Sequence, residues 1–231
     1  MFDLSPAEWT AILLSLRVAV IATLVATPFG IALAWLLARY DFWGKSVLDA
    51  FVHLPLVLPP VVTGYLLLLT LGRRGPVGAW LADNLGIVFA FRWTGAALAC
   101  GVMSFPLLVR PIRLSIEAID RRLEQAASTL GAAPWKVFAT VTLPLALPGI
   151  LAGMVLGFAK AIGEFGATIT FVSNIPGETQ VISSAIYSLI QTPDGDAAAA
   201  RLVIISVVIA TAALIGSEWF ARRATQRLHG N

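Results

Sequence analysis

Five apolar blocks constrain what this chain can fold into more than any other feature of its sequence. They cover residues 11–38, 47–71, 94–109, 141–162 and 202–221. An α-helix needs about 20 consecutive apolar residues to cross a hydrocarbon layer of about 30 Å. The third block is short for a span, and the first is long enough to tilt. The pattern predicts an all-α integral membrane protein, a polytopic helical bundle of about five transmembrane helices.

Composition agrees with a membrane environment and narrows the partners. The chain is 58% hydrophobic and only 13% charged, whereas soluble domains are roughly 45–50% apolar and about 25% charged. Its mean hydropathy is +0.85. The net charge of +3 comes from cations spread among the apolar blocks. Because they form no basic face, membrane lipid is an expected partner and nucleic acid is not. We expect residues 1–231 to form a single transmembrane domain.

The cations in the loops predict the orientation of the chain. The larger set follows the first, third and fifth blocks and comprises Arg39, Lys45, Arg110, Arg113, Arg121, Arg122, Lys136, Arg222, Arg223 and Arg227. The smaller set follows the second and fourth blocks and comprises Arg73, Arg74, Arg92 and Arg201. Loops rich in Lys and Arg stay on the cytoplasmic side. The N-terminus is therefore expected outside and the C-terminus in the cytoplasm. Residues 161–200 lack Lys and Arg and are expected on the outer side, where short re-entrant or interfacial helices are tolerated beside a cavity.

The segment 119–136 in the richest cytoplasmic loop predicts two short helices that meet at a turn. Asp120 is a suitable cap for the first helix, and Gly131 suits the left-handed position after its end. Pro134 suits the first turn of the next helix. Leu123, Ala126, Ala127 and Leu130 share one helical face. Small alanines at the centre of this face allow a close approach to a partner groove; the alternative is a helix that lies on the membrane surface.

The spacing in this loop resembles a known motif. Gln125-Ala126-Ala127, followed by Gly131 and then by Leu143-Pro144, resembles the EAA loop of ABC importer permeases. The resemblance implies that residues 119–144 form a cytoplasmic coupling loop that docks into a cleft of an ATPase subunit. The implied coupling residues are Glu124, Gln125, Ala126, Ala127, Leu130, Gly131, Leu143 and Pro144. Gln125 stands where the family usually has Glu, so the anionic contact is either shifted to Glu124 or lost.

Three further stretches, 53–65, 161–179 and 186–193, resemble the permease subunits of molybdate importers. The resemblance implies a type I ABC importer permease (MetI-like) fold in the bacterial inner membrane, working by alternating access. It also implies a homodimer, two ATP-binding subunits on the cytoplasmic side, and a periplasmic or lipid-anchored molybdate-binding protein. The Gly163-Glu164-Phe165-Gly166 element resembles sulfate and thiosulfate permeases too. Sulfate, thiosulfate or tungstate transport are therefore alternatives.

No residues point to a nucleotide site or to catalysis in this chain. Gly44-Lys45-Ser46 looks like the tail of a P-loop, but Arg39 stands where the first Gly of that motif is required. We therefore expect no enzyme, no bound cofactor, and ATP and Mg only on the partner ATPase. Cys100 has no intrachain partner, which excludes a disulfide within the chain and a cysteine-rich metal site. A stand-alone channel or secondary transporter is the alternative of another class, but the inverted repeats typical of such transporters are not seen.

Polar and helix-breaking residues inside the blocks are candidates for the translocation path. Lys160 and Glu164 are spaced i, i+4, and a straight helix from residue 141 places Lys160 about 28 Å along it, near the outer surface. The pair either flanks the outer mouth of the path and attracts an oxyanion, or is a structural ion pair. Gly166, Thr168, Pro59 and Pro60 complete the candidate path.

Two further sequence patterns are candidates for a role in transport. Uncharged donors at Thr168, Thr170, Ser173 and Asn174 offer an oxyanion site without a counter-charge. Gly149, Gly153 and Gly157 repeat at four-residue spacing, which permits close helix approach. This stripe either packs inside the subunit or lines the axis of the homodimer. Pro55, Pro59 and Pro60 in the second block either kink the helix or line the path.

Overall fold

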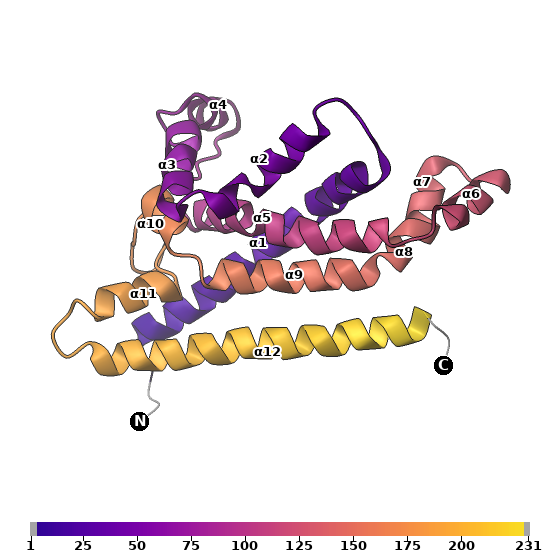
Figure 1. Ribbon diagram of the computed structural model, residues 1–231. Coiled ribbons are helices and arrows are strands. Elements are labelled where there is room, and N and C mark those ends of the chain that lie inside the picture. The colour runs from indigo at the N-terminus through magenta and orange to yellow at the C-terminus, as the bar shows by residue number, and fades with distance from the viewer. Residues whose placement is uncertain (1–3, 229–231) are drawn as a thin grey trace.

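The computed structural model describes residues 4–228, with side chains described for residues 4–216, and the described chain is helical throughout (Figure 1). The membrane bundle is built from α1 (Pro6–Arg39), α2 (Lys45–Val57), α3 (Pro60–Leu71), α5 (Trp93–Glu117), α9 (Leu147–Ile162) and α12 (Asp196–Leu228). Shorter helices connect them: α4 (Pro76–Leu85), α6 (Arg121–Thr129), α7 (Pro134–Val137), the π-helical η1 (Phe138–Thr142), α8 (Leu143–Leu145), α10 (Gly166–Val172) and α11 (Ile182–Leu189).

The prediction of about five spans is confirmed, with a correction to their shape. Three helices, Pro6–Arg39, Trp93–Glu117 and Asp196–Gly216, are long and apolar enough to cross a membrane, and two bent pairs raise the number to five when each pair is one span. Helices α2 and α3 meet at 114°, and the segments Pro134–Leu145 and Leu147–Ile162 meet at 68°. The second and fourth spans are therefore broken. The sequence offered a proline kink in the second span as one of two interpretations, and it predicted no break in the fourth.

Proline explains the first break. Pro59 and Pro60 have no backbone N–H, so neither can donate to the helix that precedes it. Helix α2 ends at Val57, and Pro60 starts α3 at its first turn, where a missing N–H costs nothing. The predicted kink is confirmed at Pro59 and Pro60, whereas Pro55 lies inside α2 and does not end it. The third span is longer than predicted, because α5 continues through Pro106 and Pro111 to Glu117.

The glycine stripe of α9 packs inside the subunit. A Cβ added at Gly149 would lie 2.3 Å from Ser115 Cβ and 2.7 Å from the Pro111 carbonyl oxygen, both in α5. A Cβ at Gly153 would lie 2.5 Å from the Leu108 carbonyl oxygen. These distances show that α9 and α5 approach with almost no side chain between them. The packing interpretation is confirmed, and the alternative that this face lines the dimer axis is wrong, because α5 of the same chain covers it.

The bundle has two distinct ends. Helices α6, α7 and α8 lie at one end, whereas α10, α11 and the start of α12 lie at the other (Figure 1). At the latter end α3 packs directly on α10, where a Cβ at Gly64 would lie 2.5 Å from the Ala167 carbonyl oxygen. The loop between α3 and α4, which carries Arg73 and Arg74, also belongs to this end. The two predicted sets of cations thus lie at opposite ends of the bundle. Three members of the larger set, Arg222, Arg223 and Arg227, have side chains outside the described residues.

Candidate functional site

Helix α6 has the local structure that its sequence predicts. The Asp120 carboxylate accepts a hydrogen bond of 2.9 Å from the Arg122 amide, which caps the helix. Gly131 has φ +84°, the left-handed conformation that ends the helix, and Ala132 N–H donates back to the Ala127 carbonyl oxygen at 3.2 Å. Pro134 occupies the first turn of α7. The predicted cap, turn and second helix start are confirmed.

The apolar face of α6 is not covered by the subunit. No residue of α6 is buried, and Leu130, which follows its last residue, is 89% exposed. Ala126 is exposed as well, and Ala127 is half-buried. Helices α6 and α7 stand out from the bundle beyond the ends of α5 and α9 (Figure 1). A narrow stripe of alanine and leucine is therefore available to a partner.

Glu124 lies on the opposite flank of α6 and faces its own subunit. Its carboxylate pairs with the Arg39 guanidinium, with 3.1 Å between Nε and Oε2, and accepts a hydrogen bond of 2.6 Å from the Thr142 hydroxyl. Gln125, the motif position, is exposed. The structure thus separates two residues that the sequence placed together as ATPase contacts. The sequence carried no signal for this pairing, because the Arg39 and Thr142 side chains come from distant segments.

Leu143 and Pro144 occupy the joint between the loop and α9. Leu143 packs against the buried cluster that contains Ile112, Ile116 and Ile150, and Pro144 occupies the first turn of α8. The π-helical η1 immediately precedes them. These two residues are part of the base of the coupling loop and not of its exposed stripe.

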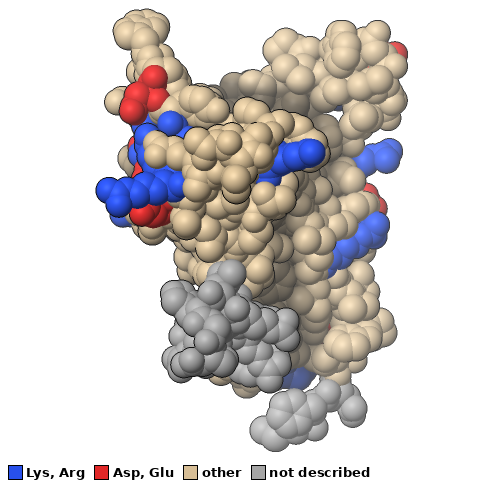
Figure 2. Space-filling model, turned by 90° about the vertical axis from the view of Figure 1, so that its right-hand side faces the viewer, with Lys and Arg blue, Asp and Glu red and all other residues tan. Residues whose placement is uncertain are grey.

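The end that carries α6 is rich in charges. Figure 2 faces this end and shows Lys and Arg side chains exposed on it, with Asp and Glu among them. Arg113 Nη1 lies 2.9 Å from Asp49 Oδ1, which ties α5 to α2. Lys45 Nζ lies 2.8 Å from Asp41 Oδ1 in the loop before α2, and this hydrogen bond and charge lower the pKa of the Asp41 carboxyl. The charges that predicted a cytoplasmic side therefore also bind the loops of that side together.

Lys160 and Glu164 form an ion pair at the opposite end. Lys160 Nζ lies 2.8 Å from Glu164 Oε2, and the Glu164 side chain is only 1% exposed. The other carboxylate oxygen accepts a hydrogen bond of 2.9 Å from the Ala167 amide near the start of α10, and Ser183 donates to the Glu164 carbonyl oxygen at 2.8 Å. Glu164 therefore holds α9, α10 and α11 together. The bend before α9 also corrects the straight-helix position of Lys160, which lies about 20 Å along α9 from its start.

The candidate path residues gather where α3 meets α10. Pro60 touches Gly166, since a Cβ added at Gly166 would lie 2.7 Å from Pro60 Cβ. Glu164 and Thr168 lie on the same stretch of chain as Gly166, and Pro59 lies beside Pro60 at the break between α2 and α3. The structure thus brings the six predicted path residues into one region, although they come from two distant parts of the sequence.

The proposed set of uncharged donors needs correction. The Thr168 hydroxyl donates to the Phe165 carbonyl oxygen at 2.9 Å, and the Thr170 hydroxyl donates to that of Gly166 at 2.8 Å. Asn174 Nδ2 donates to Ser188 Oγ at 2.6 Å. The two threonine hydroxyls and one Asn174 N–H are therefore used within the subunit and are not free for an anion in this conformation. Ser173, the fourth member of the predicted set, is exposed. Thr63 on α3 was missed: its hydroxyl is buried, and among the described residues it has no hydrogen-bond partner.

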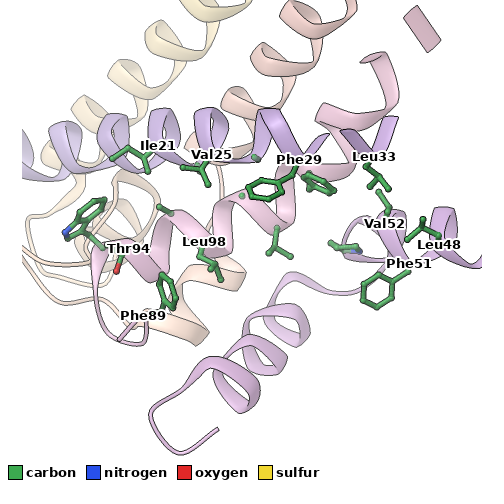
Figure 3. Close-up of a pocket in the computed structure, with 18 residues that line it drawn as sticks. Ile21, Val25, Phe29, Leu33, Leu48, Phe51, Val52, Phe89, Thr94 and Leu98 are labelled. Atoms are coloured by element: carbon green, nitrogen blue, oxygen red, sulfur yellow. The ribbon is translucent and has the colours of Figure 1, made fainter. Parts of the chain in front are cut away.

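A large cavity between the first spans is apolar and unsuited to an oxyanion. It encloses about 700 Å³ between α1, α2 and α5. Figure 3 shows Val25, Phe29 and Leu33 of α1 facing Phe51 of α2 and Leu98 of α5 across it. A divalent anion in such a site would lose its hydration without gaining donors, which is strongly unfavourable. None of the six candidate path residues lines this cavity.

Similarity to known proteins agrees with this architecture. Residues 26–226 match the family described as "Binding-protein-dependent transport system inner membrane component". The chain is 62% identical to the molybdenum transport system permease protein ModB of Escherichia coli (strain K12), over 97% of this chain and 98% of that protein. It is 56% identical to ModB of Haemophilus influenzae, over 96% of each chain.

The fold has a counterpart among solved ABC importers. A chain from the MetNI methionine ABC transporter, solved in inward-facing conformations, superposes with a TM-score of 0.66 over 94% of each chain, at 12% identity. The predicted MetI-like permease fold is confirmed. The chain belongs to the family of binding-protein-dependent transport system inner membrane components. It is thus the multi-pass, inner-membrane permease component of an ABC transporter.

Proposed function

We propose that this chain carries molybdate across the bacterial inner membrane as the permease of an ATP-driven importer. The observation that most strongly supports this proposal is the 62% identity to Escherichia coli ModB, which extends over 97% of this chain. Because the similarity covers nearly the whole chain, it includes both the coupling loop and the region where α3 meets α10. Sulfate, thiosulfate and tungstate remain the alternative substrates, since they share the tetrahedral oxyanion chemistry.

The coupling loop, residues 119–144, is the proposed contact with the ATPase. Ala126 and Leu130 are the exposed residues at the centre and end of the stripe, Ala127 beside them is half-buried, and the capped ends of α6 keep it helical without any buried residue. A helix with small side chains at its centre inserts closely into a groove of a partner. Gln125 is an exposed, uncharged polar side chain on another face of α6, and Gly131 follows the end of the helix.

The assembly that this function requires contains two copies of the chain, two ATP-binding subunits and a molybdate-binding protein on the outer side, periplasmic or lipid-anchored. ATP and Mg bind the ATPase. With α6 on the cytoplasmic side, the start of α1 lies outside and the end of α12 lies in the cytoplasm. This orientation satisfies the positive-inside rule, because the larger set of described loop cations lies on the side of α6.

The proposed translocation path passes the region where α3 meets α10. Lys160 supplies the positive charge that attracts the oxyanion, while Glu164, Gly166 and Thr168 shape the start of α10. The break at Pro59 and Pro60 allows α2 and α3 to move against each other. Alternating access would change these contacts when the ATPase closes and opens.

A bulky substitution on the stripe tests the coupling contact. Ala126→Arg places a long charged side chain at the centre of the exposed face. We expect it to abolish copurification of the ATPase in mild detergent and to abolish ATP-driven uptake. Ala126→Ser keeps a small side chain at the same position and should retain both. If Ala126→Arg leaves assembly and transport unchanged, the stripe is not the ATPase contact.

Uptake into proteoliposomes tests the substrate. The permease, its ATPase and its binding protein are reconstituted, and radiolabelled molybdate is offered with and without excess sulfate. Uptake that needs ATP and resists sulfate supports the molybdate function. Efficient competition by sulfate favours the sulfate alternative. Uptake without ATP in the presence of a proton gradient would instead indicate a secondary transporter.

A further inference from the structure

The attachment of α6 to its own subunit is polar. Because no residue of α6 is buried, hydrophobic packing does not hold this helix against the bundle. Its strongest contact is the Glu124 carboxylate. Oε2 lies 3.1 Å from Arg39 Nε, and Oε1 accepts hydrogen bonds from Arg39 Nε at 3.2 Å and from the Thr142 hydroxyl at 2.6 Å. One carboxylate thus receives donors from two other elements.

These three side chains are shielded from water. The side chains of Arg39 and Glu124 are 9% and 18% exposed, and Thr142 is 1% exposed. Charge-assisted hydrogen bonds to a carboxylate are roughly twice as strong as neutral ones. In a shielded site, loss of one partner leaves the other charge poorly compensated. The contact is therefore a rigid joint and not a transient surface ion pair.

The two donors belong to the elements through which α6 can act on the membrane spans. Arg39 is the last residue of α1, and its Nη2 also donates to the Ile119 carbonyl oxygen at 3.4 Å, just before α6 begins. Thr142 is the last residue of η1, which leads through α8 into α9. Helix α1 packs against α5 and α9 in the core of the bundle. A displacement of α6 is thus passed to two spans at once.

The π-helical turn makes the second connection important. π-helical turns are rare and are frequently found at functional sites. Without the Thr142 hydrogen bond, movement of α6 would reach α9 only through the chain of η1 and α8. The hydroxyl bond links α6 to the far end of η1, so that the movement can bypass this turn.

We propose that Glu124, Arg39 and Thr142 form a transmission joint that converts displacement of α6 into displacement of α1 and α9. This proposal rests on the proposed function, in which α6 contacts the ATPase. The residues act through the position of α6 and touch neither substrate nor nucleotide. Their loss should uncouple ATP hydrolysis from transport while leaving the exposed stripe, and hence the ATPase contact, in place.

The test compares variants that keep or remove each hydrogen bond. Glu124→Gln removes the charge but keeps the shape, and Thr142→Val removes the hydroxyl at nearly equal volume. Thr142→Ser and Arg39→Lys are the matched controls, which keep the hydroxyl and the charge. Each variant is reconstituted with the ATPase and the binding protein. Copurified ATPase, ATP hydrolysed and molybdate taken up are then measured on the same preparation.

We expect Glu124→Gln to keep ATPase copurification and to lower molybdate uptake per ATP by about tenfold, a value within the usual range of coupling between two sites. Thr142→Val should lower the uptake per ATP by a smaller factor, and Thr142→Ser should keep the wild-type value. If the molybdate taken up per ATP hydrolysed is unchanged in both Glu124→Gln and Thr142→Val, the proposed joint is wrong. A proportional loss of assembly, hydrolysis and uptake also overturns it, since that pattern indicates a role in folding alone.

The outcome for the wild-type complex separates this proposal from the proposed function. If no ATPase copurifies with the wild-type chain, the proposed function fails. If the wild-type complex transports molybdate and the joint variants do so with the same yield per ATP, only the joint fails. If Glu124→Gln does not fold, Thr142→Val and Thr142→Ser decide the question, because both retain the ion pair.

Discussion

Helices α6 and α9 follow each other closely in the chain but are held in opposite ways. Helix α9 lies in the core, and its glycines bring its backbone against α5. Helix α6 has no buried residue and depends on a cap at Asp120, a left-handed Gly131 and the Glu124 ion pair. One helix is positioned by shape and the other by a few polar contacts.

The difference shows how a transport subunit can combine a rigid span with an exposed contact. Close backbone packing resists deformation, because each atom already touches another. Polar anchors hold a helix in position while leaving its apolar face uncovered. Changes near α9 should therefore affect the stability of the whole bundle, whereas changes in α6 should remain local.

The largest effect is expected at the Lys160–Glu164 ion pair at the end of α9. Lys160→Met leaves the buried Glu164 carboxylate without its partner, so the complex should lose about 3 kcal/mol, the lower end of the range for breaking a buried pair. Thermal unfolding in detergent measures the loss. Lys160→Arg keeps the charge and should unfold near the wild-type temperature.

The Lys160→Met variant also tests whether Lys160 takes part in the translocation path. Uptake at limiting molybdate, corrected for the amount of folded protein, should fall in Lys160→Met. Unchanged corrected uptake would leave Lys160 with a structural role only.

A smaller loss is expected within the α5–α9 contact. Gly149→Ala would bring a Cβ to 2.3 Å from Ser115 Cβ and 2.7 Å from a backbone oxygen, which must shift to make room. Overpacking of this kind costs about 1–3 kcal/mol. Gly157→Ala is the matched control, because its Cβ would lie at an ordinary 3.6 Å from Leu108. Equal melting temperatures for the two variants would contradict the close approach.

The smallest effect is expected in α6 itself. Asp120→Ala removes the helix cap, which costs about 1 kcal/mol of local helix stability. Hydrogen exchange of residues 121–129 should become faster, while the melting temperature of the bundle stays the same. Asp120→Asn keeps a capping oxygen and serves as the control. A lower melting temperature for Asp120→Ala would show that α6 and the bundle are not independent.

Local sequence signals predicted the elements of this protein well. The apolar blocks predicted the spans, and Asp120, Gly131 and Pro134 predicted the ends of the helices in the coupling loop. These signals work because capping and hydrophobic burial depend on residues close in the chain. The 114° break at Pro59 and Pro60 was foreseen only as one of two alternatives, since proline both kinks helices and lines cavities.

Long-range contacts were beyond the reach of sequence patterns. Glu124 was expected to face the ATPase, yet it pairs with Arg39, which lies 85 residues earlier in the chain. The hydroxyls of Thr168 and Thr170 were expected to face an anion, yet they donate to carbonyl oxygens of their own helix. Spacing indicates which helical face a residue occupies but not which partner covers that face.

The sequence by itself determined that this chain crosses a membrane and which loops carry the positive charge. It also determined where a helix with small residues lies in the loop between the third and fourth spans. Each of these properties follows from residues that are neighbours in the chain. The tertiary structure alone decided that α5 covers the glycines of α9, that α3 meets α10 and that Glu124 faces inward. Those contacts join distant segments, so their energies depend on how the helices pack and not on the order of residues along any one of them.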